Sequence, residues 1–306
     1  MKFIPRCRNV VLLDHTGQLG NRLILMSHFI AAAEEFGLQV HDFALAPHRK
    51  NFAGLVNNPF FTYPPRHVGW DAGALTKLLR KPLASWCRRR SSALEGKEGW
   101  LGYFDVNHRP GIRLDGEVFA RWMSIHRTFI PWGYDYRCVP WLDKHLPKIR
   151  EFLKPVGEYA TRAATLLEKI RSSGRIPVGI HMRIGGDQKT FFGGCWYFPP
   201  EVYLEWMRKL LPLFGGKPVT FVVCSDEPLP TGLLDSLSAV YSPRHLAEDF
   251  ALLYGCDYVM GTVSTFSEMA GLLGSKPHYV FAERNQNLTS LEDFKIPDFK
   301  NRILPL

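Results

Sequence analysis

Cysteine is scarce in this chain, and its spacing excludes the protein classes that depend on it. The 306 residues contain 6 cysteines, and no two of them form a CxxC pair or a Cys/His cluster with zinc-finger spacing. Several lie inside apolar runs, as Cys224 does in FVVCSD. We therefore predict reduced thiols that mostly pack as small hydrophobic side chains, in a reducing compartment.

Long apolar runs are missing as well. No stretch approaches the roughly 20 apolar residues that cross a bilayer. The N-terminal sequence MKFIPRCRNVVLLD lacks the apolar core and the small-residue cleavage site of a signal peptide, so we expect a cytoplasmic protein. The hydrophobic fraction of 46% and the charged fraction of 22% are those of an ordinary globular protein, which argues against disorder, collagen and coiled coil.

Acidic residues are outnumbered by basic ones. Lysine and arginine total 38 and aspartate and glutamate 29, which gives a net charge of +9. This excess favours nucleotide phosphates, nucleic acid or an anionic membrane, without choosing among them. Residues 77–90 carry six basic residues and no acidic one, interleaved with leucine and tryptophan. We expect this segment to contact the inner face of a membrane, with a solvated loop as the alternative.

Alternating strand and helix signals predict an α/β fold with doubly wound parallel sheets. In the first half, Val10–Asp14 is an apolar run typical of a buried strand. Arg22–Phe36 predicts a helix that Gly37 ends, and Leu38–Leu45 predicts a second strand. From Asn51 to Tyr136 the signal is weak, and Val139–Arg171 predicts one or two helices.

The second half gives clearer signals. Predicted strands cover Ile176–Met182, Val219–Ser225, Ala239–Tyr241, Tyr258–Val263 and His278–Phe281, and predicted helices cover Pro200–Leu213, Leu246–Cys256 and Thr265–Leu273. The length suits two domains, which we place at 1–150 and 151–306, with the C-terminal tail packing back on the first. Ligands of such sheets bind at the carboxyl ends of strands, so we expect a site in a cleft between two lobes.

Three groups of residues fall at such strand ends. The first is the turn Gly17-Gln-Leu-Gly20-Asn21-Arg22, which precedes a helix. Glycine lets the backbone approach a ligand, and a helix N-terminus favours an anion. A plain turn between strand and helix is an equal alternative, because the motif is neither GxGxxG nor a Walker sequence.

The second group follows the strand IPVGIHM. His181 and Arg183 are two residues apart, so strand alternation places them on one face. Arginine in a glycine turn suits bidentate binding of a diphosphate. His181 could hydrogen-bond a base or a leaving-group oxygen, and Asp187 could act as base or orienting group. The alternative is a buried structural histidine with a surface salt bridge.

The third group is the hydroxyl-rich start of a helix. Ser264 or Thr265 is the expected N-cap, and the same free N–H groups could bind phosphate. Two acids accompany it. Asp226 follows a predicted strand and could accept hydrogen bonds from guanine, while Asp249 lies in a predicted helix. The alternative is that both are ordinary acidic residues on the protein surface.

Taken together, these groups resemble the fucosyltransferase superfamily, which includes α-1,2-, α-1,6- and protein O-fucosyltransferases. Its G-x-x-G-N-Q turn is similar to Gly17–Asn21, with Arg22 in place of glutamine. Its H-x-R-R-G-D motif is partly matched by His181, Arg183 and Gly185. In this chain Ile184 replaces the second arginine, and the aspartate comes one residue late, as Asp187.

Two further segments carry the resemblance. The stretch from Asp249 to Ser267 looks like the family's closing segment, which ends in S-T-F-S. The run KTFFGGCWYFPPEVY, residues 189–203, looks like bacterial members of the α-1,2 branch. The resemblance implies a two-lobed GT-B fold, GDP-fucose as donor, a glycan or lipid-linked oligosaccharide as acceptor, inversion at the anomeric carbon, and neither metal nor cofactor.

The resemblance also implies roles for single residues. Arg183 would hold the diphosphate, and Ser264 and Thr265 would cap the phosphates. His181 and Asp226 would lie near the guanosine, and Gly20 and Asn21 would approach the donor from the first lobe. The alternatives are another nucleotide-sugar donor, an inactive relative, or a basic nucleic-acid-binding protein, although no RNA-binding motif is present.

Overall fold

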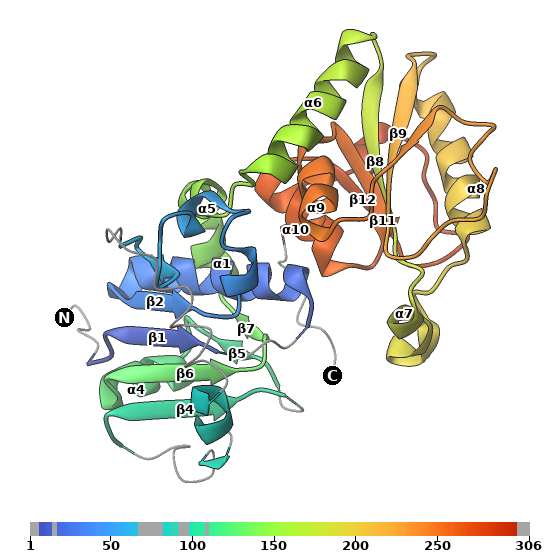
Figure 1. Cartoon of the computed structure of the whole chain (residues 1–306). Coiled ribbons are helices and arrows are strands. Elements are labelled where there is room, and N and C mark those ends of the chain that lie inside the picture. The colour runs from blue at the N-terminus through green and yellow to red at the C-terminus, as the bar shows by residue number, and fades with distance from the viewer. Residues whose placement is uncertain are drawn as a thin grey trace. The chain divides into compact units, whose positions relative to one another are not determined.

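The computed structural model describes residues 6–13, 17–66, 82–87, 89–90, 98–107 and 110–298, without the side chains of residues 187, 191 and 192 (Figure 1). Contacts divide the chain into a first unit that runs to Lys154 and a second unit from Pro155 to Pro297. Each unit is built on its own largely parallel sheet, which confirms the predicted α/β class. Among the described residues, no helix is both long and apolar enough to cross a membrane.

The first unit has a five-stranded sheet in the order β3-β2-β1-β6-β4. All neighbours are parallel except the edge strand β3, which is antiparallel to β2. Its strands are β1 (Asn9–Leu12), β2 (Gln39–Asp42), β3 (Thr62–Tyr63), β4 (Leu101–Asp105) and β6 (Thr128–Trp132), with a small pair β5 (Ile112–Arg113) and β7 (Tyr136–Arg137). Its helices are α1 (Leu19–Phe36), α4 (Glu117–Ile125) and α5 (Val139–Phe152), with the short 3-10 turns η1 (Ala46–His48) and η2 (Ala53–Leu55).

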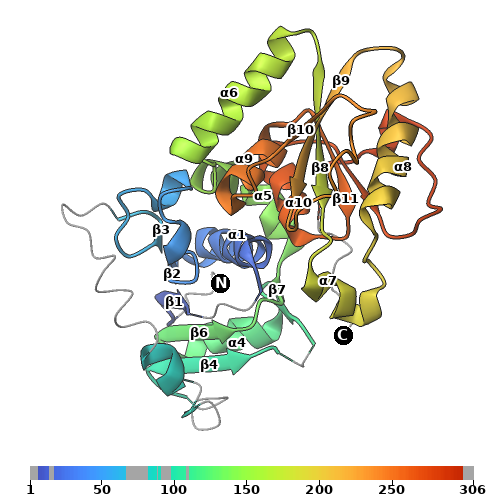
Figure 2. The ribbon, with the colours of Figure 1, turned by 45° about the vertical axis from the view of Figure 1, so that its right-hand side comes forward.

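Helix α1 lies along one face of the first sheet (Figure 2), and aromatic side chains pack together on this face. Phe129 of β6 packs against Phe119 of α4, with ring centroids 5.9 Å apart, and Phe119 also meets Phe29 of α1. The next residue, Ile130, points to the opposite face, where it packs with Cys87 of the helical segment 82–87. Because successive side chains of β6 point to opposite faces of the sheet, this strand contributes to the hydrophobic core on each face.

The second unit has a five-stranded parallel sheet in the order β10-β9-β8-β11-β12. Its strands are β8 (Ile176–Met182), β9 (Val219–Ser225), β10 (Ala239–Tyr241), β11 (Tyr258–Thr262) and β12 (His278–Phe281). Its helices are α6 (Glu158–Ser172), α7 (Gly186–Thr190), α8 (Pro200–Leu210), α9 (Leu246–Gly255) and α10 (Thr265–Gly274), with 3-10 turns η3 (Phe191–Gly194), η4 (Leu211–Phe214) and η5 (Leu291–Asp293).

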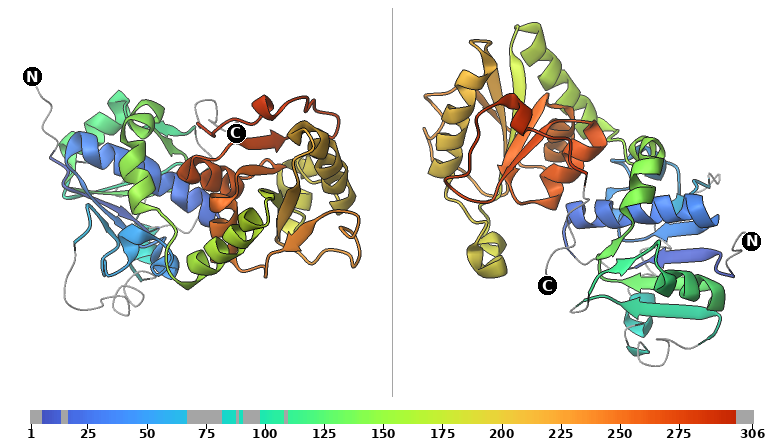
Figure 3. Two further views of the ribbon diagram at one scale, coloured as in Figure 1. Left: turned by 90° about the horizontal axis from the view of Figure 1, so that it is seen from above. Right: turned by 180° about the vertical axis from the view of Figure 1, so that it is seen from behind.

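Helices cover both faces of the second sheet, with α8 on one side and α6, α9 and α10 on the other (Figure 3). Ile180 and Met182 of β8 belong to the core under α8, whereas His181 lies against Phe266 of α10. The central strands approach closely: a Cβ placed on Gly261 would come within 2.8 Å of the His181 carbonyl oxygen. Only glycine fits there without displacing backbone.

The predicted elements of the second half agree with the structure to within a residue or two, except that α8 gives way to η4 after Leu210. The region in which the sequence signal is weak contains β4, α4 and β6, which the sequence pattern did not predict. Residues 139–171, predicted as one or two helices, form two. The predicted helix start at Arg22 is wrong, because α1 begins at Leu19 after an N-cap, Gln18, that makes no side-chain cap.

The structure agrees with the predicted packing of the cysteines as buried thiols. All six cysteines are free thiols, and only Cys195 is exposed. Burial raises the pKa of Cys7 and Cys87 to about 11, which keeps these thiols protonated and unreactive.

Candidate functional site

Two of the three predicted groups, together with the predicted acid Asp226, meet at one edge of the second sheet. The strands β9, β8 and β11 are neighbours and run in parallel, so their carboxyl ends share an edge. His181 and Arg183 lie at the end of β8, Asp226 follows β9, and Ser264 follows β11. The sheet topology thus places adjacent in space residues that are up to about eighty positions apart in the sequence.

Arg183 lies just beyond β8 and is held by a glutamine that the sequence did not single out. Its Nε donates to Oε1 of Gln188 at 3.0 Å, and its backbone N–H donates to the hydroxyl of Tyr203 at 3.2 Å. Gln188 is only 5% exposed. Burying an amide costs free energy unless the amide is hydrogen-bonded. The bond to Arg183 therefore holds both the Gln188 amide and the guanidinium in place.

The same glutamine ties the turn to the neighbouring strand. Its Nε2 donates to the carbonyl oxygen of Trp196 at 3.4 Å, and that oxygen also accepts the hydroxyl of Thr262 at 3.0 Å. Thr262 is the last residue of β11 and is fully buried. These hydrogen bonds, from Arg183 through Gln188 and Trp196 to Thr262, therefore join the ends of β8 and β11.

His181 is buried, as the structural alternative held, and it is also uncharged. Desolvation, with the nearby positive charge of Arg183, lowers the pKa of His181 to about 3. Its ring lies 5.2 Å from that of Phe266, and among the described residues its Nδ1 has no hydrogen-bond partner. A neutral imidazole of such low basicity suits hydrogen bonding better than taking a proton.

Asp226 shapes the glycine turn. Its Oδ1 accepts the backbone N–H groups of Ile184 at 2.8 Å and Gly185 at 3.0 Å. These two bonds fix the direction of the chain immediately after Arg183. Asp226 itself is exposed at the sheet edge.

Ser264 is the N-cap of α10, one of the two caps expected. Its hydroxyl accepts the N–H of Phe266 at 3.3 Å, and Thr265 is the first residue of the helix. Ser267, at the third helical position, donates its hydroxyl to the carbonyl of Ser264 at 3.3 Å. The positive end of the α10 dipole therefore faces the shared sheet edge.

A hollow of about 350 Å³ opens at the ends of β9 and β10. Its wall includes Glu227, Tyr241, Ser242 and Arg244. Arg244 has a left-handed backbone, with φ of 58°, and its N–H donates to the Ser242 hydroxyl at 3.0 Å. Such a conformation in a non-glycine residue is uncommon and clusters at functional sites.

Asp249 lies behind this hollow rather than on the surface. Its carboxylate makes a short hydrogen bond with the Ser242 hydroxyl, and the side chain is nearly buried. Desolvation raises the pKa of Asp249 to about 6, aided by the neighbouring charge of Glu248 and opposed by Ser242. Asp249 therefore supports the wall and does not act as a surface acid.

In the first unit, the predicted glycine turn lies at the carboxyl end of β1. Gly17 has φ of 72°, and a Cβ there would come within 2.1 Å of the Asn21 side chain. Gly20 and Asn21 lie in the first turn of α1. Arg22 donates to the carbonyls of Gly17 at 3.2 Å and Ala44 at 3.3 Å, so it braces the turn.

A buried carboxyl at the end of the neighbouring strand β2 escaped the sequence analysis. Asp42 is 1% exposed, its Oδ1 accepts the N–H of Leu45 at 3.0 Å, and its Oδ2 has no partner among the described residues. Burial raises the pKa of Asp42 to about 7, against the opposing effects of backbone hydrogen bonds and of Arg22.

Two predicted features fall outside the described part of the molecule. The backbone of Asp187 is helical, but its side chain is not described. Four of the six basic residues of the basic segment also lie outside, namely Lys77, Arg80, Lys81 and Arg88. Within its described part, Leu83 and Trp86 are exposed, at 39% and 46%.

Comparison with known proteins rests on structure alone. No protein-family model matches the chain, and no curated protein matches its sequence. A variant of FUT1 of Arabidopsis thaliana in complex with GDP is similar with a TM-score of 0.56 and 13% identity, covering 90% of this chain and 70% of that one. Fucosyltransferase NodZ from Bradyrhizobium is similar with a TM-score of 0.53 and 18% identity, covering 90% and 94%.

A NodZ α-1,6-fucosyltransferase soaked with GDP-fucose is similar with a TM-score of 0.50 and 17% identity, covering 90% of this chain and 95% of that one. These likenesses show that the chain has the two-lobed α/β fold of GT-B fucosyltransferases. The resemblance found in the motifs is therefore confirmed at the level of the fold.

Asp42 generates a prediction about stability and pH. An aspartate in an unfolded chain titrates near about pH 4, whereas the folded pKa is about 7. The folded state binds the proton more tightly, so the free energy of unfolding falls as the pH rises through this window and stays low above it. Asp42→Asn should remove that fall, and its advantage over the wild type should grow by about 2.5 kcal/mol between about pH 5 and about pH 8.

Chemical denaturation of both proteins between about pH 5 and about pH 8 measures this difference. Asp235→Asn, at an exposed position of the second unit, is the control and should show no such trend. A difference in unfolding free energy that stays constant with pH would show that Asp42 titrates normally in the folded protein.

Proposed function

We propose that this protein is an inverting, metal-independent glycosyltransferase that moves fucose from GDP-fucose to a hydroxyl group of a glycan, in the manner of an α-1,2-fucosyltransferase. One observation carries the proposal. A fixed arginine and a helix N-terminus occupy the ends of adjacent parallel strands, β8 and β11, in a fold shared with fucosyltransferases.

The chemistry of the transfer fits these groups. Breaking the sugar–phosphate bond leaves negative charge on GDP and positive charge on the sugar ring. Arg183 can fork onto two phosphate oxygens, and the N–H groups at Ser264 and Thr265 can bind a third. Because both are in place before the reaction, they stabilise the developing charge without reorganising. They would stabilise the negative charge of the diphosphate, as a metal ion does in other enzymes.

The hollow at the ends of β9 and β10 would take the nucleoside. A volume of about 350 Å³ suits a purine with its ribose. Tyr241 offers an aromatic surface that is 49% exposed, and the Glu227 carboxylate can accept hydrogen bonds from guanine amines. In this scheme Asp226 reaches the guanosine only indirectly, through the turn that it holds.

Proton transfer from the acceptor needs a base. His181 is neutral and buried, so it suits hydrogen bonding to the donor better than accepting a proton. We therefore propose Asp187 as the base. From the first unit, Gly20 and Asn21 at the start of α1 would contact the donor. The acceptor is proposed to be a glycan or a lipid-linked oligosaccharide.

A donor panel tests the proposal. The purified protein should release GDP from GDP-fucose in the presence of glycan acceptors, and an excess of EDTA should leave the rate unchanged. Release with GDP-mannose but not with GDP-fucose would establish a different donor. An inactive relative would bind GDP without turnover, and tight, salt-sensitive binding of oligonucleotides without GDP binding would establish the nucleic-acid alternative.

Arg183 and Gln188 give a sharper prediction. Arg183→Ala should lower turnover about 10²-fold, the scale for loss of one preorganised charge-stabilising donor, and Arg183→Lys should recover little, because lysine cannot bind two oxygens in a fork. Gln188→Leu should lower turnover by about tenfold through misplacement of the guanidinium. GDP release and melting temperature are measured on the same preparations.

The matched control is Arg208→Ala, on the exposed surface of α8. It should change neither GDP release nor melting temperature. If Arg183→Ala melts at a lower temperature but keeps normal turnover per folded molecule, Arg183 is a structural residue and the proposed role is wrong.

We also propose that the basic segment from Lys77 to Arg90 docks the enzyme on an anionic membrane. Support comes from its described part, where Leu83 and Trp86 are exposed beside Arg89 and Arg90. Each basic residue near such a surface contributes about 1 kcal/mol.

The protein should therefore sediment with anionic vesicles at low salt and not with neutral ones. Trp86→Ser should weaken this binding, whereas Trp100→Ser, at a 66% exposed tryptophan outside the segment, should not. A protein that stays in the supernatant with anionic vesicles would contradict membrane docking.

A further inference from the structure

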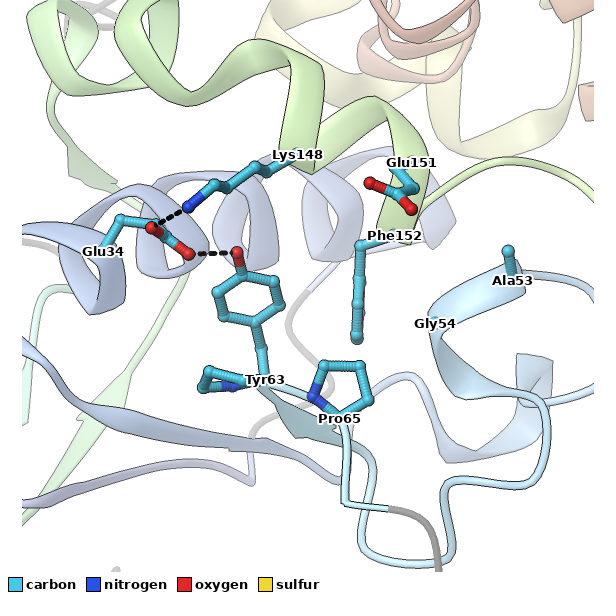
Figure 4. A pocket seen from close by; sticks show the side chains of 9 residues that line it. Glu34, Ala53, Gly54, Tyr63, Pro65, Lys148, Glu151 and Phe152 are labelled. Atoms are coloured by element: carbon cyan, nitrogen blue, oxygen red, sulfur yellow. Dashed lines mark hydrogen bonds and ion pairs between the residues drawn. The ribbon is translucent and has the colours of Figure 1, made fainter.

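A second hollow lies in the first unit and takes no part in the proposed reaction. It has a volume of about 400 Å³ and opens between the ends of α1 and α5, the turn η2 and the segment after β3 (Figure 4). Its wall includes Glu34, Tyr63, Pro65, Lys148, Glu151 and Phe152. We name it the α5 pocket.

The α5 pocket lies toward the edge of the first sheet opposite the glycine turn. Tyr63 pairs with Val40 near the start of β2, and the Gln39 side chain donates to the carbonyl of Pro64 at 2.9 Å. Glu34 is fourteen residues beyond Gly20 along α1, which corresponds to about 21 Å of helix. A ligand here would therefore be distinct from the donor that Gly20 and Asn21 are proposed to contact.

The floor of the pocket is apolar and fixed. The rings of Tyr63 and Phe152 meet edge to face, with centroids 5.2 Å apart, and both residues are about 95% buried, at 5% and 4% exposure. A Cβ on Gly54 would come within 2.0 Å of the Phe152 ring, so the ring rests directly on backbone. An apolar, preformed cavity of this size is typical of a small-molecule site.

One of the two carboxylates is already engaged. Glu34 accepts hydrogen bonds from the Tyr63 hydroxyl and from Lys148, which Figure 4 shows on one side of the pocket. Burial acts to raise the pKa of Glu34, but these two donors outweigh it and hold the pKa below its ordinary value. Glu34 and Lys148 thus neutralise each other.

The other carboxylate, Glu151, has no such partner. It is exposed in the last turn of α5, above the Phe152 ring in Figure 4, and it makes no hydrogen bond or ion pair with any other described residue. The negative end of the α5 dipole lies beside it and favours a cation there. The α5 pocket therefore presents one uncompensated negative charge over an apolar floor.

We infer that the α5 pocket binds a small organic cation, an ammonium or guanidinium group on an apolar stem. The stem would lie against Pro65 and Phe152, and the cation would pair with Glu151. The nearby aromatic rings add a favourable cation–π contribution. The same chemistry is offered by a free amine and by the basic side chain of a peptide.

Titration calorimetry with phenethylamine tests the inference, in the presence of saturating GDP so that the nucleotide site is occupied. Phenethylamine should bind saturably, and phenethyl alcohol and phenylpropionate, its neutral and anionic analogues, at least about tenfold more weakly. Glu151→Gln should weaken phenethylamine about tenfold, and Ala53→Phe should fill the cavity and abolish binding. Glu117→Gln, at an exposed glutamate of α4, is the control and should bind normally.

A capped peptide with a single arginine separates the two sources of the ligand. Competition by the peptide assigns the pocket to a basic side chain, and phenethylamine binding without competition assigns it to a free amine. Equal binding of amine and alcohol, or normal affinity in Glu151→Gln, overturns the inference. Because GDP is present throughout and turnover is not measured, this outcome does not depend on the proposed transferase activity.

Discussion

The buried amide of Gln188 imposes the constraint on which the candidate site depends. A primary amide removed from water must satisfy both its oxygen and its nitrogen. It does so with the Nε of Arg183 and the carbonyl of Trp196, which Thr262 also binds. These bonds therefore hold the turn after β8, the chain at Trp196 beyond η3 and the end of β11 in one arrangement. Asp226 fixes the same turn from the side of β9.

Burial sets the charge state of this edge as much as hydrogen bonding does. His181 is kept neutral by desolvation, so Arg183 has no competing positive charge beside it. Asp249 is buried too, and its bond to Ser242 ties α9 to the wall of the hollow at the ends of β9 and β10. In the proposed reaction, the positive charge that stabilises the diphosphate would come from two groups of the second unit, Arg183 and the N-terminus of α10.

The sequence predicted most of the second unit because its strands are short apolar runs bounded by glycine, proline or serine. Such runs leave little choice of conformation once they are buried on both faces. β4 and β6 were missed because their residues, LGYFD and TFIPW, mix aromatic, polar and proline side chains without a clear period. Gln188 and Asp42 could not be found, since their importance comes from tertiary burial and neither residue type marks it locally.

The two sheets also differ in when they can form. The strands β1 to β4 and β6 of the first sheet and the helix α5 that packs on α1 all precede Pro155, and the second unit is one uninterrupted stretch from there to Pro297. Domains generally fold as units during synthesis, the N-terminal one first. The first sheet can thus be complete while β8 is still inside the ribosome. The apolar strands of the first unit are then already buried when the apolar strands of the second unit leave the ribosome.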